Sequence, residues 1–90
     1  MPGLLQNHIA VITGAGSGIG RAIALGYARE GATVATLDIN GEPAAETAKA
    51  IRDAGSKAQA FTLDVSDRAA CRTVAAEVAK QLGKVSILVN

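Results

Sequence analysis

The chain has 90 residues, which is enough for one small domain. Apolar residues make up 49% of it, so a buried core can form, but aromatic residues make up only 2% and the core must rest on Ala, Val, Ile and Leu. The formal net charge is +1 and the basic residues are scattered, which argues against a protein that binds nucleic acid or a membrane surface.

Predicted strands and helices alternate along the chain. Apolar, β-branched runs predict strands over four segments: residues 8–13, 33–37, 58–63 and 85–90. Recurring apolar positions predict helices over residues 18–30 and 67–82, and Pro43 in a first turn with Gly55 just beyond the end predicts another over residues 43–54. Ser66 is expected to cap the last helix, and Gly41-Glu42-Pro43 is expected to be a tight loop before the second.

This alternation predicts the fold class. The connections are short, and no hairpin dipeptide lies between adjacent strands, so the strands should be parallel and joined by helical crossovers. Right-handed crossovers would place helices on both faces of the sheet. We therefore predict an α/β fold, a three-layer, doubly wound parallel sheet of the Rossmann type with strand order 3-2-1-4.

The chain stops directly after its fourth predicted strand. Domains seldom end inside a core strand, so we expect residues 1–90 to be the N-terminal part of a single nucleotide-binding domain, truncated after strand 4. Ligands of such sheets bind beyond the carboxyl ends of the strands, where the strand order reverses. Four polar or glycine positions follow four different strands and should converge there: Gly14, Asp38, Asp64 and Asn90.

A glycine-rich segment joins the first strand to the first helix. It reads Thr13-Gly14-Ala15-Gly16-Ser17-Gly18-Ile19-Gly20, with the spacing G-x-x-x-G-x-G. The G-x-G-x-x-G spacing does not fit, and the P-loop pattern fails because no Gly-Lys pair occurs in this segment. A strand that turns into a helix leaves unpaired N–H groups at the helix start, where the helix dipole favours a phosphate. We predict a phosphate-binding loop rather than a merely structural turn.

Each position in this loop has an expected role. Gly14 permits the tight turn, and Gly18 lets a pyrophosphate approach the backbone. Gly20 lets the first helix pack closely on the sheet, and Ser17 can donate its hydroxyl to a phosphate.

Asp38 follows the second strand, where the ribose of a dinucleotide would lie. Its carboxylate can accept hydrogen bonds from both ribose hydroxyls and repels a 2′-phosphate. At about 4 Å and an effective dielectric of about 20, two like charges cost about 4 kcal/mol before salt screening. No Arg or Lys follows in residues 39–41, so NAD is predicted in preference to NADP. The alternative is that Asp38 is a loop residue that caps the second helix.

Two further candidates remain open on spacing alone. Asp64 could accept a hydrogen bond from an adenine amino group while the N–H of Val65 points at a ring nitrogen, or it could form an Asx turn before the third helix. Asn90 could line a ribose pocket or tie neighbouring strands together.

Composition also suggests a location. The lone cysteine, Cys71, can form no internal disulfide, which fits a reducing cytoplasm, and its place on an apolar helix stripe suggests a core residue. No apolar run approaches the length of about 20 residues that a membrane-spanning helix needs.

The whole chain resembles the short-chain dehydrogenases/reductases. Residues 13–20 match their TGxxxGIG signature, Leu37-Asp38-Ile39-Asn40 looks like the end of strand 2 in NAD-preferring members, and Leu63-Asp64-Val65 resembles their adenine-binding pair. Residues 87–90 look like the start of their strand 4 motif. The resemblance implies coenzyme contacts at ten positions: Gly14, Ser17, Gly18, Ile19, Gly20, Asp38, Ile39, Asp64, Val65 and Asn90.

The resemblance also implies an activity. Members transfer a hydride between NAD(P) and the carbon of an alcohol or carbonyl substrate, and they work mainly as dimers or tetramers. Their catalytic Asn, Ser, Tyr and Lys lie beyond the part that this chain matches, so no catalytic or metal-binding residue is assigned. Tyr27 is the only tyrosine and lacks a lysine four residues later. The rival hypothesis is a non-catalytic NAD-binding or interaction module, which a stop codon directly after Asn90 would favour.

Overall fold

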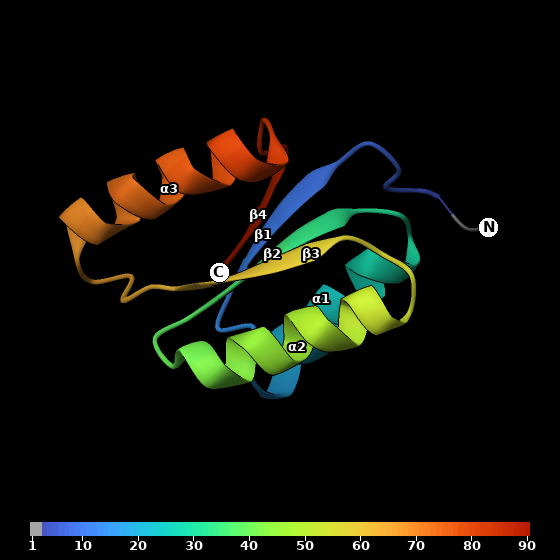
Figure 1. Ribbon diagram of the computed structural model, residues 1–90, viewed down its shortest axis with the longest axis horizontal. Helices are drawn as coiled ribbons and strands as arrows, with labels where there is room; N and C mark the ends of the chain where they lie inside the picture. The colour runs from blue at the N-terminus through green and yellow to red at the C-terminus, as the bar shows by residue number, and fades with distance from the viewer. Residues whose placement is uncertain (1–2) are drawn as a thin grey trace.

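The computed structural model describes residues 3–90, which form a single parallel sheet flanked by helices (Figure 1). Its strands are β1 (Ile9–Thr13), β2 (Thr33–Asp38), β3 (Ala58–Thr62) and β4 (Ile87–Val89), and its helices are α1 (Gly18–Arg29), α2 (Gly41–Asp53) and α3 (Arg68–Leu82). The strand order is β3-β2-β1-β4, and every neighbouring pair is parallel, as predicted. No helix among these residues is both long and apolar enough to cross a membrane.

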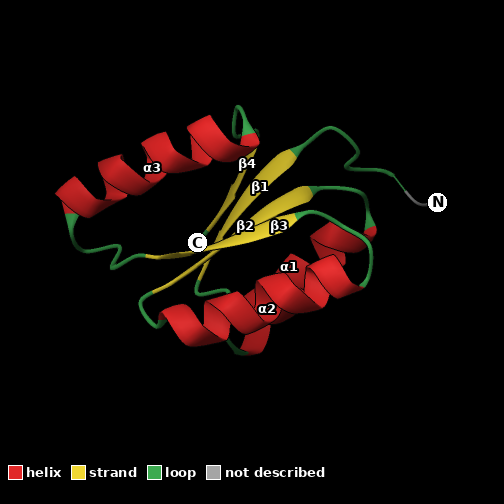
Figure 2. Cartoon of the chain, viewed as in Figure 1, coloured by secondary structure: helices red, strands yellow, loops and turns green. Residues whose placement is uncertain are grey.

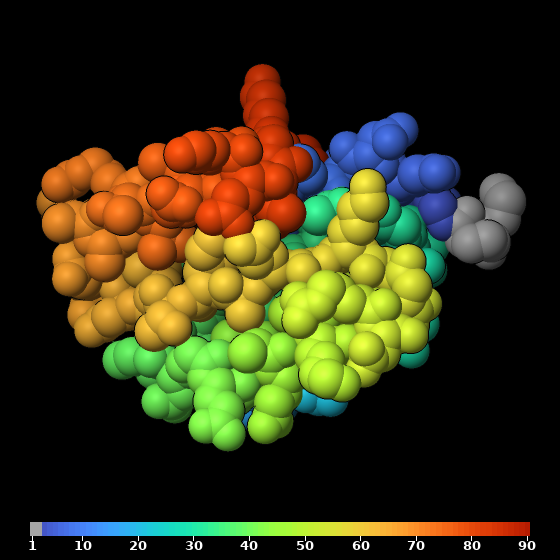
Figure 3. Space-filling model, in the orientation of Figure 1, coloured from blue at the N-terminus to red at the C-terminus, as the bar shows by residue number. Residues whose placement is uncertain are grey.

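The molecule has three layers. Helices α1 and α2 cover one face of the sheet and α3 covers the other (Figure 2). In the space-filling view, α2 and α3 form opposite sides of the molecular surface (Figure 3). Side chains of the two central strands, β1 and β2, are therefore buried on both faces, whereas the residues of β3 and β4 are half-buried or exposed.

Alternate strand residues supply the two halves of the core. The half beneath α1 and α2 is built on fully buried aliphatic side chains, among them Ile12, Val34 and Ile51. The half beneath α3 includes Val11, Leu37, Leu63 and Val78. Cys71 of α3, expected in the core, is half-buried and packs against this half of it.

Two expected boundaries are wrong. Residues 41–43 are not a loop but the first turn of α2, because Asn40 adopts an extended backbone and serves as the N-cap. Asp67, not Ser66, caps α3: its carboxylate accepts a hydrogen bond from the N–H of Ala70 at 3.0 Å. The Ser66 hydroxyl is directed at the Asp64 carboxylate, to which it donates at 2.6 Å, and it accepts no hydrogen bond from the first turn of α3 within residues 3–90.

Candidate functional site

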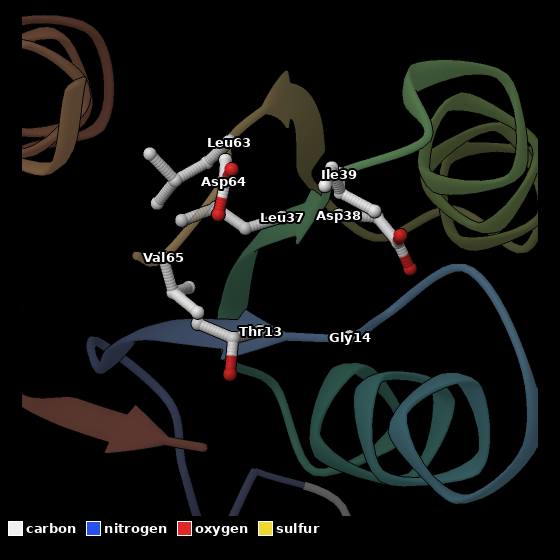
Figure 4. A pocket seen from close by; sticks show the side chains of 8 residues that line it. All are labelled: Thr13, Gly14, Leu37, Asp38, Ile39, Leu63, Asp64 and Val65. Carbon is white, nitrogen blue, oxygen red and sulfur yellow. The ribbon is translucent and has the colours of Figure 1, made fainter. Parts of the chain in front are cut away.

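A pocket of about 260 Å³ opens at the carboxyl ends of the first three strands (Figure 4). Asp38 and Ile39 lie on one side of it, and the segment from Leu63 to Val65 lies on the other. The structure thus brings together Gly14, Asp38 and Asp64, which are 24 to 50 residues apart in the sequence. The lining residues are Thr13, Gly14, Leu37, Asp38, Ile39, Leu63, Asp64 and Val65.

The glycine loop between β1 and α1 borders this pocket. Gly14 and Gly18 have φ angles of +63° and +56°, which L side chains rarely adopt, and a Cβ at either position would meet nothing within 4 Å. The space outside the loop is therefore open to a ligand. A Cβ on Gly20, in contrast, would run into the carbonyl oxygen of Gly14. Gly20 thus allows the first turn of α1 to approach the backbone that directly follows β1.

The inner side of the loop is held by β2 and α2. The Ala15 N–H donates to the carbonyl oxygen of Leu37 at 3.0 Å, and the Ala15 carbonyl accepts from the buried Thr47 hydroxyl at 2.8 Å. The next N–H, that of Gly16, donates to Oδ2 of Asp38 at 2.9 Å. These bonds fix residues 15 and 16 and leave the outer bend free.

The start of α1 has unpaired donors. Ser17 is the N-cap, with an extended backbone and no hydrogen bond from its side chain to the helix, so its exposed hydroxyl is free to donate elsewhere. The N–H groups of residues 18–20 have no acceptor within residues 3–90. The first turn also carries no acidic side chain, so the positive end of the helix dipole is not neutralised there. This arrangement can bind an anion such as a phosphate.

Asp38 is half-buried, and both of its carboxylate oxygens accept hydrogen bonds. Oδ2 accepts from Gly16, as above, and Oδ1 accepts from the N–H of Asn40 at 3.1 Å. Neither donor is an N–H of the first turn of α2. Asp38 therefore does not cap this helix, which was the alternative interpretation. Each oxygen keeps a second lone pair for a further donor.

Asp64 and Val65 lie opposite, on the segment after β3. Oδ1 of Asp64 accepts from the hydroxyl of Ser66 at 2.6 Å and from its N–H at 2.9 Å, which is the Asx turn that spacing left open. The Ser66 hydroxyl, and then its N–H, hold the pKa of Asp64 below its usual range, because both favour the ionised carboxylate. Val65 and Ile39 are each 61% exposed, so both can cover a flat apolar ring in the pocket.

Asn90 lies apart from this pocket. Its Oδ1 lies 3.2 Å from the Thr13 hydroxyl, which can donate to it and so tie the end of β4 to β1. It borders a second, largely apolar groove of about 760 Å³ between α3 and the sheet. This contact is of the strand-tying kind, one of the two alternatives for this residue.

Sequence reasoning missed two groups that shape the site. Thr47 anchors the loop through Ala15, but it lies 32 residues away and belongs to no motif. Gly16 was counted only as a variable position of the glycine signature. The signal for its role was its position, 22 residues before a carboxylate expected at the same sheet edge.

Comparison with known proteins identifies the family. The model of the short chain dehydrogenase family matches residues 8–90. Human epidermal retinol dehydrogenase 2 is 47% identical over 87 residues, which are 96% of this chain and 28% of that protein.

Solved structures of this family superpose closely. An Escherichia coli hydroxysteroid dehydrogenase is 40% identical with a TM-score of 0.93, over 96% of this chain and 37% of that one. A putative D-mannonate oxidoreductase from Haemophilus influenza, solved with bound NAD, is 33% identical with a TM-score of 0.90, over 93% of this chain and 30% of that one. The chain thus spans about a third of the length of these relatives. With its glycine loop, its sheet order and this match, the chain belongs to the short-chain dehydrogenase family.

Proposed function

We propose that residues 1–90 form the N-terminal, coenzyme-binding part of a longer NAD-dependent oxidoreductase. The intact enzyme would transfer a hydride between NAD(H) and a secondary alcohol or ketone. Relatives named for retinol, hydroxysteroid and D-mannonate differ too much in substrate to select one. By analogy with the family, the intact protein is expected to be a dimer or tetramer, and the lone Cys71 favours a cytoplasmic location.

The observation that carries this proposal is the pairing of free donors with a fixed carboxylate. The N–H groups at the start of α1 suit a diphosphate, and Asp38 lies on the same pocket with lone pairs to spare. The open space around Gly14 and Gly18 fits the approach of that diphosphate. When bound, the coenzyme would accept or donate the hydride at its nicotinamide ring.

Each part of the coenzyme has expected partners on this chain. The adenine would bind at Asp64 and Val65, and the adenosine ribose would bind at Asp38 with Ile39 beside it. The diphosphate would bind along the glycine loop, at Gly14, Ser17, Gly18, Ile19 and Gly20. Asn90 would lie beside a coenzyme ribose.

NAD is expected in preference to NADP because Asp38 is anionic and has no basic neighbour in residues 39–41. Replacing Asp38 with Ser in the intact protein should raise the use of NADP relative to NAD several-fold. Even a quarter of the about 4 kcal/mol repulsion amounts to about a fivefold change.

The measurement is the ratio of kcat/KM for the two coenzymes. Asp53→Ser is the matched control, because Asp53 lies exposed on α2 and pairs only with Lys49. An unchanged ratio in Asp38→Ser would remove the argument for NAD.

A further inference from the structure

The carboxylate of Asp38 is held from two sides before any coenzyme binds. Oδ2 accepts from the Gly16 N–H at 2.9 Å, and Oδ1 accepts from the Asn40 N–H at 3.1 Å. The first donor belongs to the glycine loop and the second to the turn between β2 and α2. Hydrogen bonds to a charged acceptor are stronger than neutral ones, so together they restrict rotation of this side chain.

Gly16 leaves no room for a side chain at this point. A Cβ there would lie 2.7 Å from Oδ2 of Asp38, 2.6 Å from Cβ of Pro43 and 3.2 Å from the backbone nitrogen of Ala44. Gly16 is not among the glycines with positive φ, so its backbone would accept an alanine. Only the lack of space excludes one.

Helix α2 cannot easily withdraw to make that space. Its first turn is tied to β2 by the buried Thr36 hydroxyl, which donates to the Ala44 carbonyl at 2.8 Å. Its second turn is tied to the glycine loop by Thr47 through Ala15, also at 2.8 Å. An added Cβ would therefore displace the Asp38 side chain, and its contact with Pro43 would push residue 16 away from α2; both movements break the bond from Gly16 to Asp38.

We propose that Gly16 is a positioning residue for coenzyme selection, acting through Asp38. This rests on the proposed function of the site as an NAD-binding site. The Gly16 N–H aims the carboxylate, whose remaining lone pairs can accept the two ribose hydroxyls. Because the carboxylate is tethered, it cannot turn away from a 2′-phosphate, so the tether adds to the discrimination that its charge provides.

The test is a double-mutant cycle in the intact protein, with Gly16→Ala, Asp38→Ser and the double variant. Calorimetry measures the affinities for NAD and NADP. Gly16→Ala should weaken NAD binding by up to about tenfold, because the untethered carboxylate must be ordered when the coenzyme binds, and it should reduce the ratio of NAD affinity to NADP affinity. In the Asp38→Ser background the same change should cost less than about threefold, because the two sites are coupled.

Gly26→Ala is the matched control. Gly26 lies in the middle of α1, and its nearest neighbour for an added Cβ is the Arg29 side chain at 3.9 Å. This variant should bind both coenzymes as the unchanged protein does. Unchanged NAD affinity and preference in Gly16→Ala would overturn the proposal, and so would an equal loss in both backgrounds, which would mean that Gly16 acts on loop shape alone.

A coenzyme-free measurement separates this proposal from the proposed function. Amide hydrogen exchange at Gly16, followed by NMR, should be at least about tenfold faster in Asp38→Ser than in the unchanged protein. Equal exchange would overturn the tether even if Gly16→Ala failed to fold. An unchanged protein that bound no NAD would instead overturn the proposed function, and with it the role of Gly16 in coenzyme selection, whatever the exchange result.

Discussion

Gly20 and Gly26 are two glycines of the same helix in very different surroundings. An added Cβ at Gly20 would strike the backbone of Gly14 and come within 3.2 Å of Cα of Ala15. An added Cβ at Gly26 would meet only the end of a flexible side chain. The sequence predicts close packing at Gly20 from its place in the glycine signature, and the structure identifies the backbone of residues 14 and 15 as what it packs against.

Replacing Gly20 with Ala should therefore destabilise the protein. A clash with backbone cannot be relieved by a rotamer change, so we expect a loss of about 2 kcal/mol or more in the free energy of unfolding. Gly26→Ala should be neutral or stabilising by up to about 1 kcal/mol, because alanine favours the helix. Urea unfolding of the intact protein, followed by circular dichroism, measures both; equal stabilities of the two variants would contradict the packing described for Gly20.

Ser66 tunes the ionisation of Asp64. Ser66→Ala removes the hydroxyl donor and keeps the N–H donor, so the pKa of Asp64 should rise part of the way to its usual value. The folded pKa lies below the unfolded one, so this interaction stabilises the fold above pH about 4 and is lost as the pH falls through the folded pKa. NMR titration of the Asp64 carboxyl checks this; Ser56→Ala, whose hydroxyl bonds Ala28, should leave it unchanged.

At the scale of elements, α2 supports the site without contacting the pocket. Its Thr47 hydroxyl reaches the loop and also lies 3.4 Å from a guanidinium nitrogen of Arg21 on α1. Both the hydroxyl and its acceptor, the carbonyl of Ala15, belong to fully buried residues. The shape of the loop thus depends on a helix that begins more than 20 residues later.

Thr47→Val should lower the free energy of unfolding by about 1–3 kcal/mol, because it leaves the buried Ala15 carbonyl without its side-chain donor. Thr73→Val on α3 is the matched control. Thr73 is exposed and donates only within its own helix, to Ala69, so its change should stay within about 0.5 kcal/mol. Denaturant unfolding measures the free energy of unfolding of both variants. A similar decrease in the two would mean that the bond between α2 and the loop does not stabilise the fold.

At the scale of the whole molecule, the described pocket suits only part of a dinucleotide. Its volume of about 260 Å³ falls below the about 300–1,000 Å³ that is usual for small-molecule sites. Among residues 3–90, β4 pairs only with β1, and Leu88 on it is 63% exposed. An exposed, apolar edge strand of this kind favours association between copies of the isolated chain.

The isolated 90-residue chain should therefore bind NAD weakly at most. The adenosine and diphosphate contacts would be present, and the contacts to the nicotinamide end would be missing. Calorimetric titration of the isolated chain, alongside the intact protein, makes this comparison. Submicromolar affinity in the isolated chain would contradict the expectation.

The fold could be predicted from the sequence because each cue is local. Apolar periodicity distinguishes helix from strand, and short connections without hairpin turns require parallel pairing. The strand order, the two-sided core and the meeting of Gly14, Asp38 and Asp64 at one edge all followed from this. The cap of α3 did not, because Ser66 and Asp67 are both good cap residues, and only the structure shows that the Asp67 carboxylate faces the Ala70 N–H while the Ser66 hydroxyl faces Asp64.

By itself, then, the amino-acid sequence determined the order of the elements, the sheet, the family and the edge where a coenzyme would lie. Only the tertiary structure decided which polar atoms face one another there: Asp38 with Gly16, Thr47 with Ala15, and Asn90 with Thr13. The physical reason is one of scale. Residue spacing determines the direction of a side chain within one element, whereas a hydrogen bond between elements depends on a separation of tenths of an ångström, which the packing of the whole core sets.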